Sequence, residues 1–462
     1  MARSPALPKY RRPPVPWHVM EVHLEDAAFL WAQWEHALWA PDYVLAEVAQ
    51  GEERRLLAHL DALVLGGRAV AERFLLPALQ GEELSAISAA GLALLGGEDV
   101  DWRETVFEWL AEGAEELISG IRRAVELSPR EDISPGLARL LPGLPPNEQA
   151  GVLAALRFRQ SDAGEALRKL KLGDDISLRT EAVRCARFAS RAIAEEWVRI
   201  GLGDSEPRVR DAALETGLVL GSRQAWTRCR QLLEEGGEVP RVALLALAMG
   251  GEGKDLEALA KALGDPSLRD EVLWALGFSG KLEAAEMAFQ SLQEVGDRLA
   301  AESFAAITGL PLGPPFIDEE ELDEEDFDEE LLDAEAESEE EEEAAPAVDS
   351  SVQELLPGPE VLPGKVQIVR VERWWQEARK HFEPTGRYLR GQPLSVELVR
   401  AALEGESMRR RPVLAWELAI RSQGACQIES RTWTHLQRSQ AQAAAGLRSD
   451  ALTRSFDRLL SR

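Results

Sequence analysis

The sequence predicts an all-α protein built as an α-solenoid, or alpha-alpha superhelix, and repetition is the main observation behind this prediction. A turn, a proline, a branched apolar residue and an arginine return in the same order at 203–221 and 262–280, residues 240–250 repeat the pattern with a shorter lead-in, and 174–189 gives a version without the proline. Aligned on their helix starts, the four copies are spaced by 31, 33 and 26 residues. Each interval also holds a second helical apolar pattern, and two short helices per repeat are typical of an α-solenoid.

The clearest copy, residues 262–280, shows why one repeat needs another. Pro266 lies near the first helical position, where its missing N–H costs nothing. Val272 and Leu276 then fall on one narrow apolar stripe, which a single helix cannot bury. Trp274 is expected to be buried between neighbouring repeats.

The string G-D-x-x-P-x-V-R-x-A-A in these copies resembles a short HEAT-like repeat, the kind shared with phycobilisome lyases, over residues 80–310. A closer resemblance runs through H-L-E-D-A-A-F-L-W at 23–31 and R-Y-L-R-G-Q-P-L at 387–394, which look like a family of proteobacterial HEAT-repeat proteins. This family brings no assigned biochemical activity with it. Its members are often encoded beside type VI secretion components, so the resemblance implies a bacterial HEAT-like α-solenoid with a partner in such a system.

Taken in order, the chain is expected to have five parts. Residues 1–16 are proline-rich and predict a disordered tail, and the tryptophan-rich residues 17–80 predict a three-helix N-terminal cap. Residues 81–310 hold the HEAT-like repeats. Residues 311–364 predict a disordered, acidic and proline-rich insertion or linker, because they cannot bury enough apolar surface to fold alone. Residues 365–462 are helical again and predict one or two further repeats and a C-terminal cap.

The formal net charge of −29 comes mostly from one tract. Residues 318–343 hold 19 Asp or Glu and no Lys or Arg, whereas the following segment, 365–462, holds 18 Arg or Lys against 10 acids. The tract is expected either to cover a basic face of that segment weakly or to act only as a solvated tether. The candidate interaction residues on this face are Arg387, Arg390, Arg400, Arg409, Arg410 and Arg411.

No catalytic, cofactor-binding or metal-binding pattern stands out. The six histidines make no close metal-binding pair. The string G-G-E-G-K-D at 250–255 resembles a phosphate-binding loop only superficially, because Asp255 replaces the required hydroxyl residue, and it predicts a helix–helix turn. Three distant cysteines suggest no disulfide framework and fit a reducing cytoplasm, and no apolar run is long enough to span a membrane.

These patterns favour a non-enzymatic, cytoplasmic scaffold or adaptor, without cofactor, that binds a protein partner on the concave face of the solenoid. One alternative is a nucleic-acid-binding HEAT-like solenoid, which would need a basic groove. Pairing of the repeat arginines with acids of the next repeat argues against it. The other alternative is a prosthetic-group lyase or chaperone-like protein, which rests on analogy of fold alone. The repeat arginines in question are Arg208, Arg210, Arg241 and Arg269.

Overall fold

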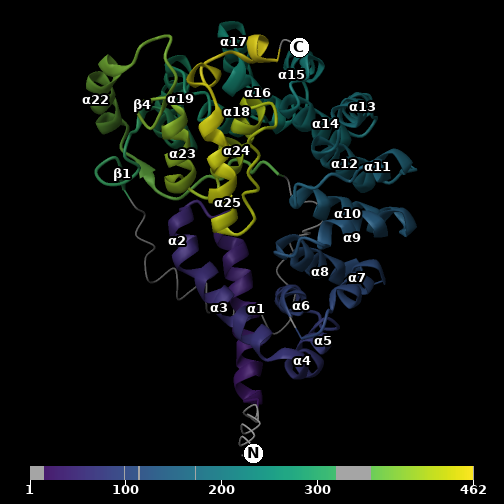
Figure 1. The fold of residues 1–462 in the computed structure, drawn as a ribbon. Helices are drawn as coiled ribbons and strands as arrows, with labels where there is room; N and C mark the ends of the chain where they lie inside the picture. The colour runs from purple at the N-terminus through teal and green to yellow at the C-terminus, as the bar shows by residue number, and fades with distance from the viewer. Residues whose placement is uncertain (1–14, 98, 113–114, 172, 319–354, 461–462) are drawn as a thin grey trace, which may run out of the picture. The chain divides into compact units, whose positions relative to one another are not determined.

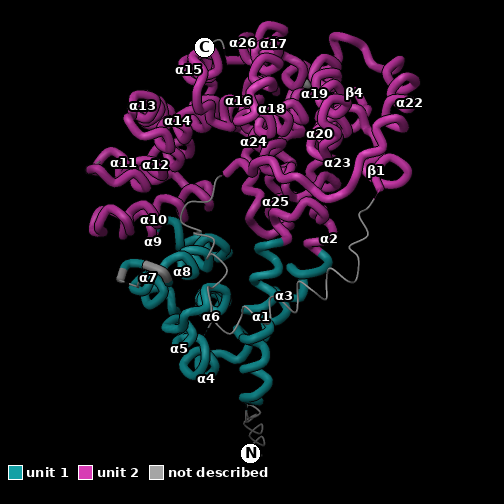
Figure 2. The backbone as a smooth tube through the Cα atoms, turned by 180° about the vertical axis from the view of Figure 1, so that it is seen from behind, with its two compact units in different colours: residues 1–36, 50–135 teal, residues 37–49, 136–462 magenta. Residues whose placement is uncertain are grey.

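The structure is a computed structural model that describes residues 15–97, 99–112, 115–171, 173–318 and 355–460. Most of these residues are helical, which confirms the all-α prediction (Figure 1). The chain divides into two compact units, one of residues 1–36 and 50–135 and the other of residues 37–49 and 136–462 (Figure 2). All of the acidic tract beyond Asp318 lies outside the described residues.

The elements that lie wholly or mostly in the first unit are α1 (Trp17–Ala37), α3 (Glu52–Leu65), α4 (Gly67–Val70), the π-helix η1 (Ala71–Leu75), α5 (Leu76–Ala78), α6 (Leu84–Gly96), α7 (Arg103–Glu112) and α8 (Glu115–Leu127). A buried tryptophan joins the first two long helices: Trp34 of α1 donates a hydrogen bond from Nε1 to Glu53 of α3 at 3.2 Å. The predicted N-terminal cap is divided, because residues 37–49 belong to the second unit.

The second unit begins with a long series of short helices. They are α2 (Leu45–Gln50), α9 (Ile133–Leu140), η2 (Leu141–Gly143), α10 (Pro146–Phe158), α11 (Glu165–Lys169), α12 (Ile176–Cys185), η3 (Ala186–Phe188), α13 (Arg191–Leu202), α14 (Pro207–Val219), α15 (Arg223–Glu235), α16 (Arg241–Gly250), α17 (Gly253–Ala262), α18 (Arg269–Leu276), α19 (Leu282–Val295) and α20 (Arg298–Thr308).

Alternate helices of this series pack side by side. α10 contacts α12, and the same neighbour contact continues through α14, α16, α18 and α20, which we call the central row. The helices α13, α15, α17 and α19 each pack against the member of the row that follows them. Each predicted repeat therefore contributes one helix to the row and one beside it.

Local signals explain where the helices of the row begin. Pro207 is the first residue of α14, where proline's fixed φ suits a helix start. Asp175 precedes α12, and its side chain accepts a hydrogen bond from the Leu178 N–H, which satisfies one of the free donors of the first turn. Pro266 differs from the prediction, because it lies in a turn three residues before α18 begins at Arg269.

Residues 365–460 of the second unit are called the C-terminal segment. It contains β2 (Lys365–Val366), α22 (Ile368–Ala378), η5 (Arg379–His381), β3 (Tyr388–Leu389), β4 (Gln392–Pro393), α23 (Val396–Gly405), α24 (Arg411–Arg421), α25 (Thr434–Ala441), η6 (Gln442–Gly446), η7 (Ser449–Ala451) and α26 (Phe456–Leu459). β2 pairs antiparallel with β1 (Ile317–Asp318), and β3 pairs with β4.

The C-terminal segment packs back onto the central row instead of extending it as further repeats. α24 contacts α14, and β2 and β3 contact α20. The chain comes especially close at Gly280 and Gly309, which follow α18 and α20 with positive φ. A Cβ at Gly280 would lie 2.8 Å from the backbone oxygen of Tyr388, and one at Gly309 would lie 2.6 Å from that of Arg390. Only glycine allows this backbone conformation and this approach together.

Candidate functional site

The predicted interaction residues lie mostly inside the second unit. Four of them are at most 5% exposed, Arg390 is partly buried, and Arg400 alone among the six is exposed. The four buried residues are Arg387, Arg409, Arg410 and Arg411. The expected basic face is therefore not an open surface in the structure, because a buried guanidinium group is stable only when it is paired or hydrogen-bonded within the protein.

Three arginines of the C-terminal segment bind the carboxyl ends of α16 and α18. Arg421 donates from Nη2 to the Met249 carbonyl of α16 at 3.0 Å, and Arg410 donates from Nη2 to the Gly277 carbonyl that follows α18, also at 3.0 Å. Arg387 donates to two further carbonyl groups after α18, at 2.8 and 3.2 Å. The last turn of a helix leaves carbonyl groups without partners and favours a positive charge. These contacts therefore fasten the C-terminal segment to the central row.

A buried carboxylate completes this attachment. Glu417 of α24 accepts hydrogen bonds from Arg387 at 2.7 Å and from Arg421 at 2.6 Å. Burial alone would raise the pKa of Glu417, but the two guanidinium groups outweigh it and lower that pKa. Burial lowers the pKa of Arg421 to about 10. Glu417 and Arg421 thus remain charged at neutral pH.

A different kind of contact is made by residues 355–361, which have no regular secondary structure and which we call the strap. Arg241 at the start of α16 donates from Nη1 to the Leu356 carbonyl at 3.0 Å, and Trp274 of α18 donates from Nε1 to the Pro357 carbonyl at 2.9 Å. Both donors bind main-chain oxygens, which every peptide possesses. The central row therefore holds the strap largely through its backbone.

A third contact holds the strap near its C-terminal end. Arg409 donates from Nη1 to the Glu360 carbonyl at 2.9 Å and lies 3.3 Å from the Glu360 carboxylate. Arg409 is itself fixed by Glu302 of α20, at 2.6 and 2.7 Å, and its guanidinium group stacks 4.8 Å from the ring centre of Trp274. The donors that bind the strap are thus held in place by other contacts. Trp274 is fully buried, which confirms the prediction for this residue.

The strap's side chains also have defined surroundings. Leu356 is 8% exposed, whereas Val361 is 60% exposed. A Cβ at Gly358 would lie 2.5 Å from the Nη2 of Arg241, and Glu271 holds that guanidinium group in place at 2.7 and 2.9 Å. The position of Gly358 therefore has no room for a side chain without moving Arg241.

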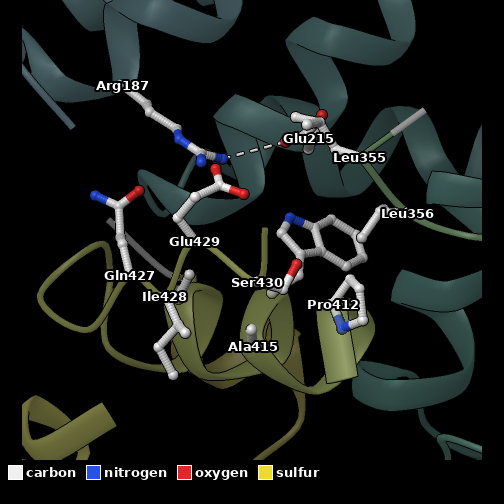
Figure 3. Close-up of a pocket in the computed structure, with 12 residues that line it drawn as sticks. Arg187, Glu215, Leu355, Leu356, Pro412, Ala415, Gln427, Ile428, Glu429 and Ser430 are labelled. Atoms are coloured by element: carbon white, nitrogen blue, oxygen red, sulfur yellow. Dashed lines mark hydrogen bonds and ion pairs between the residues drawn. The ribbon is translucent and has the colours of Figure 1, made fainter. Parts of the chain in front are cut away.

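A small cavity of about 50 Å³ lies beside Leu355 and Leu356 at the start of the strap, and we call this cavity together with the donors Arg241, Trp274 and Arg409 the groove (Figure 3). Leu355 and Leu356 form one side of it, and the loop that carries Glu429 and Ser430 forms another. Trp416 also lines this cavity, and its buried Nε1 donor has no hydrogen-bond partner in the part of the chain that the structure describes. The strap thus leaves space unfilled beside its first two residues.

Two other residues of the cavity lining carry buried polar atoms of this kind. The Oε1 acceptor of Gln427 and the Nε donor of Arg187 are buried and find no hydrogen-bond partner among the described residues. Arg187 uses Nη1 instead, on Glu215 of α14 at 3.1 Å, the contact drawn in Figure 3. Burial lowers the pKa of Arg187, and Glu215 opposes this effect. These three polar atoms are thus buried within side chains that line the cavity.

The string at 250–255 forms the expected helix–helix turn. It lies between α16 and α17 with a capping box: the Glu252 side chain accepts a backbone N–H at the third position of α17, and the Asp255 carboxylate accepts the Glu252 N–H at 2.8 Å. Asp255 also pairs with Arg230 at 2.8 Å. The place that an anion would take at this helix start is filled by the chain's own carboxylates.

The repeat arginines are mostly used within the second unit. Arg210 donates to the Asp204 and Ser205 carbonyl groups, Arg241 pairs with Glu271, and Arg269 donates to a serine of α19. Arg208 is exposed. These contacts agree better with arginines that pair within the protein than with a continuous basic groove.

The described residues show few other features of a functional site. No three His, Cys, Asp or Glu among the described residues are grouped so that they could hold a metal ion. All three cysteines, Cys185, Cys229 and Cys426, are free and buried, as expected of core residues. None of the described helices combines the length and apolarity needed to cross a membrane.

The sequence does contain a pattern that indicates that another segment covers the central row, and the predictions above did not use it. Residues 242–250 of α16 read V-A-L-L-A-L-A-M-G and are buried on every side. A solenoid helix with one open face would carry polar residues on that face, and a helix that is apolar all round is buried all round. The strap residues carried no such signal, because Leu-Leu-Pro-Gly-Pro looks like any short linker.

Comparison with known proteins adds no assignment to this geometry. No protein-family model matches the sequence, and a search of curated proteins finds no significant match.

Proposed function

We propose that this chain is a non-catalytic protein-binding scaffold or adaptor of HEAT-like repeats, and that its partner contributes a peptide segment to the groove that holds the strap. Stacked helix pairs with one helix of each pair in a common row are what a HEAT-like solenoid requires. The arrangement of α10 to α20 supports this interpretation, because neighbouring members of the row pack on one another.

The observation that carries the proposal is the recognition of main-chain carbonyl groups by side chains of the row. Arg241 and Trp274 donate to consecutive strap carbonyls, at 3.0 and 2.9 Å. Such donors bind a peptide without depending on most of its side chains, which suits an adaptor. The resemblance to a family encoded near type VI secretion genes suggests a secretion component as the partner.

The nucleic-acid alternative receives less support. Binding to phosphate needs arginines and lysines with free guanidinium or ammonium groups along one groove. Five arginines of the C-terminal segment are buried, and three of these, Arg387, Arg409 and Arg421, pair with Glu417 or Glu302 inside the second unit. No observation favours the lyase alternative.

Site-specific photo-crosslinking tests the proposal. A photoreactive amino acid is placed at Ser430, beside the strap groove, and separately at Arg228 on α15, away from it. Cross-linking in the cells that naturally produce the chain should yield one dominant protein adduct from position 430 and none of that size from position 228. Affinity of the purified partner is then measured by calorimetry. A partner that cross-links equally from both positions, or from 228 alone, would contradict the proposal.

A further inference from the structure

The strap and the C-terminal segment both cover the central row, but only the strap is held by contacts that another peptide could reproduce. Its attachment consists of carbonyl groups bound by Arg241, Trp274 and Arg409, one buried leucine, and one ion pair in which Glu360 is exposed and Arg409 is buried. The C-terminal segment, in contrast, inserts whole guanidinium groups that are at most 5% exposed. A competing peptide can therefore replace the strap without exposing the core.

We propose that the strap is a displaceable internal ligand and that its groove accepts, from a partner protein, an extended segment with the order apolar–Pro–Gly–x–acid. This inference rests on the proposed function and names the ligand of that site. The binding of the partner segment and the binding of the strap then exclude each other, so the strap keeps the groove closed until the partner arrives.

Each position of this order follows from a contact of the strap. The apolar residue corresponds to Leu356, which is 8% exposed. Proline corresponds to Pro357. It suits this position because the contact with Trp274, at 2.9 Å, is made by the carbonyl group and requires no N–H. Glycine corresponds to Gly358, where a Cβ would lie 2.5 Å from Arg241. The acid corresponds to Glu360, whose carboxylate lies 3.3 Å from Arg409.

The cavity beyond Leu355 explains how a partner segment could bind better than the strap. Leu355 and Leu356 leave a cavity of about 50 Å³ between themselves and the loop of Glu429 and Ser430. A segment with larger side chains at this place fills the cavity and gains van der Waals contacts that the strap does not make. The partner needs this difference, because a tethered strap competes at a high effective concentration.

The continuation of the chain keeps the displaced strap near its groove. β2 begins four residues after the strap, at Lys365, and pairs with β1 through Ile317 and Val366. This ribbon contacts α20 of the central row. The strap can therefore return when the partner leaves, and the exchange is reversible.

A peptide-binding experiment on the full chain tests the inference. The probe is a fluorescein-labelled synthetic peptide of residues 353–362, Q-E-L-L-P-G-P-E-V-L. Fluorescence anisotropy measures its affinity for the wild-type chain, for Leu356→Asp, which loosens the strap, and for the matched control Val361→Asp. Leu356→Asp should bind the probe at least about tenfold more tightly than the wild type, because its own strap no longer competes, and Val361→Asp should resemble the wild type.

A second pair of variants locates the probe. Arg241→Ala, combined with Leu356→Asp, should weaken probe binding by about tenfold, since one main-chain contact is lost. Arg208→Ala, in the same P-R-V string of the preceding repeat but exposed, should have no effect in the same background. A probe carrying aspartate in place of its leucine at position 356 should not bind. Circular dichroism confirms that each variant is folded.

Three results would overturn the inference: equal affinity of the wild type and Leu356→Asp, no binding to either folded protein, or insensitivity to Arg241→Ala. A dimer of the wild type that disappears in Leu356→Asp, seen by sedimentation, would show that a second copy is the occupant and would overturn it too. If the cross-linked partner binds equally well to the Arg241→Ala and Arg208→Ala variants, the proposed function stands and this inference fails. If the probe behaves as expected but no partner is cross-linked, the proposed function fails and the assignment of the strap as a displaceable ligand stands.

Discussion

The strap and the C-terminal segment cover neighbouring parts of the same row of helices, yet they are attached in opposite ways. The C-terminal segment sends charged side chains such as Arg387 and Arg410 into the row, where they bind helix ends. The strap's one charged side chain, that of Glu360, stays 57% exposed beside Arg409, and the row sends side chains out to bind the strap's backbone. The direction of the hydrogen bonds thus separates a structural attachment from a removable one.

The largest expected effect is the loss of a buried arginine from the C-terminal segment. Arg387→Ala removes the donor to two carbonyl groups after α18 and to Glu417, and leaves buried acceptors without a partner. The free energy of unfolding should fall by about 3–5 kcal/mol, measured by urea denaturation. Arg400→Ala is the matched control, because Arg400 is the exposed member of the six predicted arginines, and it should change stability by less than about 0.5 kcal/mol. Equal effects of the two would show that the buried contacts do not stabilise the fold.

Acid should loosen the C-terminal segment more than the strap. The folded state lowers the pKa of Glu417 and of Glu406, mainly because arginines outweigh the effect of burial. Such groups stabilise the fold fully above their unfolded pKa, near about 4.3, and this stabilisation is lost as pH falls through their lower folded values. Urea denaturation between pH 7 and pH 3 should therefore show a falling free energy of unfolding. Glu417→Gln should flatten this dependence, and an unchanged slope would contradict the role given to Glu417.

A smaller effect is expected when the strap loses one hydrogen bond. Trp274→Phe keeps an aromatic ring in a fully buried site but removes the Nε1 donor to the Pro357 carbonyl. The strap should become more sensitive to limited proteolysis after Glu360, while global stability falls by about 1 kcal/mol. Trp226→Phe is the control, since Trp226 donates to Asp457 instead of the strap. If both variants are cut after Glu360 at the wild-type rate, the Trp274 contact does not hold the strap.

The smallest effect is expected of the native cysteines. Burial raises the pKa of Cys185 and Cys229 to about 12 and that of Cys426 to about 11, so all three thiols are protonated and shielded at neutral pH. None should react with a thiol reagent in the folded protein, and all three should react in urea. Rapid labelling of any of them without denaturant would contradict their place in the core.

Sequence reasoning predicted the helices of the repeats well, because each depends on local signals. The apolar positions of α18, the proline at the start of α14 and the buried Trp274 follow from spacing and turn chemistry. The attachment of the C-terminal segment did not follow. Arg387 and Arg410 look like surface arginines in the sequence, and they are buried only because helix ends from more than a hundred residues away lie beside them.

The candidate groove also could not be predicted from the sequence. Its contacts join Arg241 and Trp274 to strap carbonyls 115 and 83 residues away, and backbone oxygens carry no residue identity. The strap falls within the stretch predicted as a disordered linker, residues 311–364. Both described ends of that stretch, 311–318 and 355–364, are instead placed by contacts with the second unit.

The most direct test of the contrast compares thiol labelling at one buried leucine in each region. Leu356→Cys reports on the strap and Leu414→Cys reports on α24, and the two leucines are 8% and 5% exposed. Labelling rates are measured in the native protein at increasing, sub-denaturing urea. A locally opening strap should label position 356 quickly and with little dependence on urea, whereas position 414 should label slowly and only as the whole unit unfolds. Identical opening free energies and urea dependences at the two positions would contradict the account, because strap and C-terminal segment would then be released together.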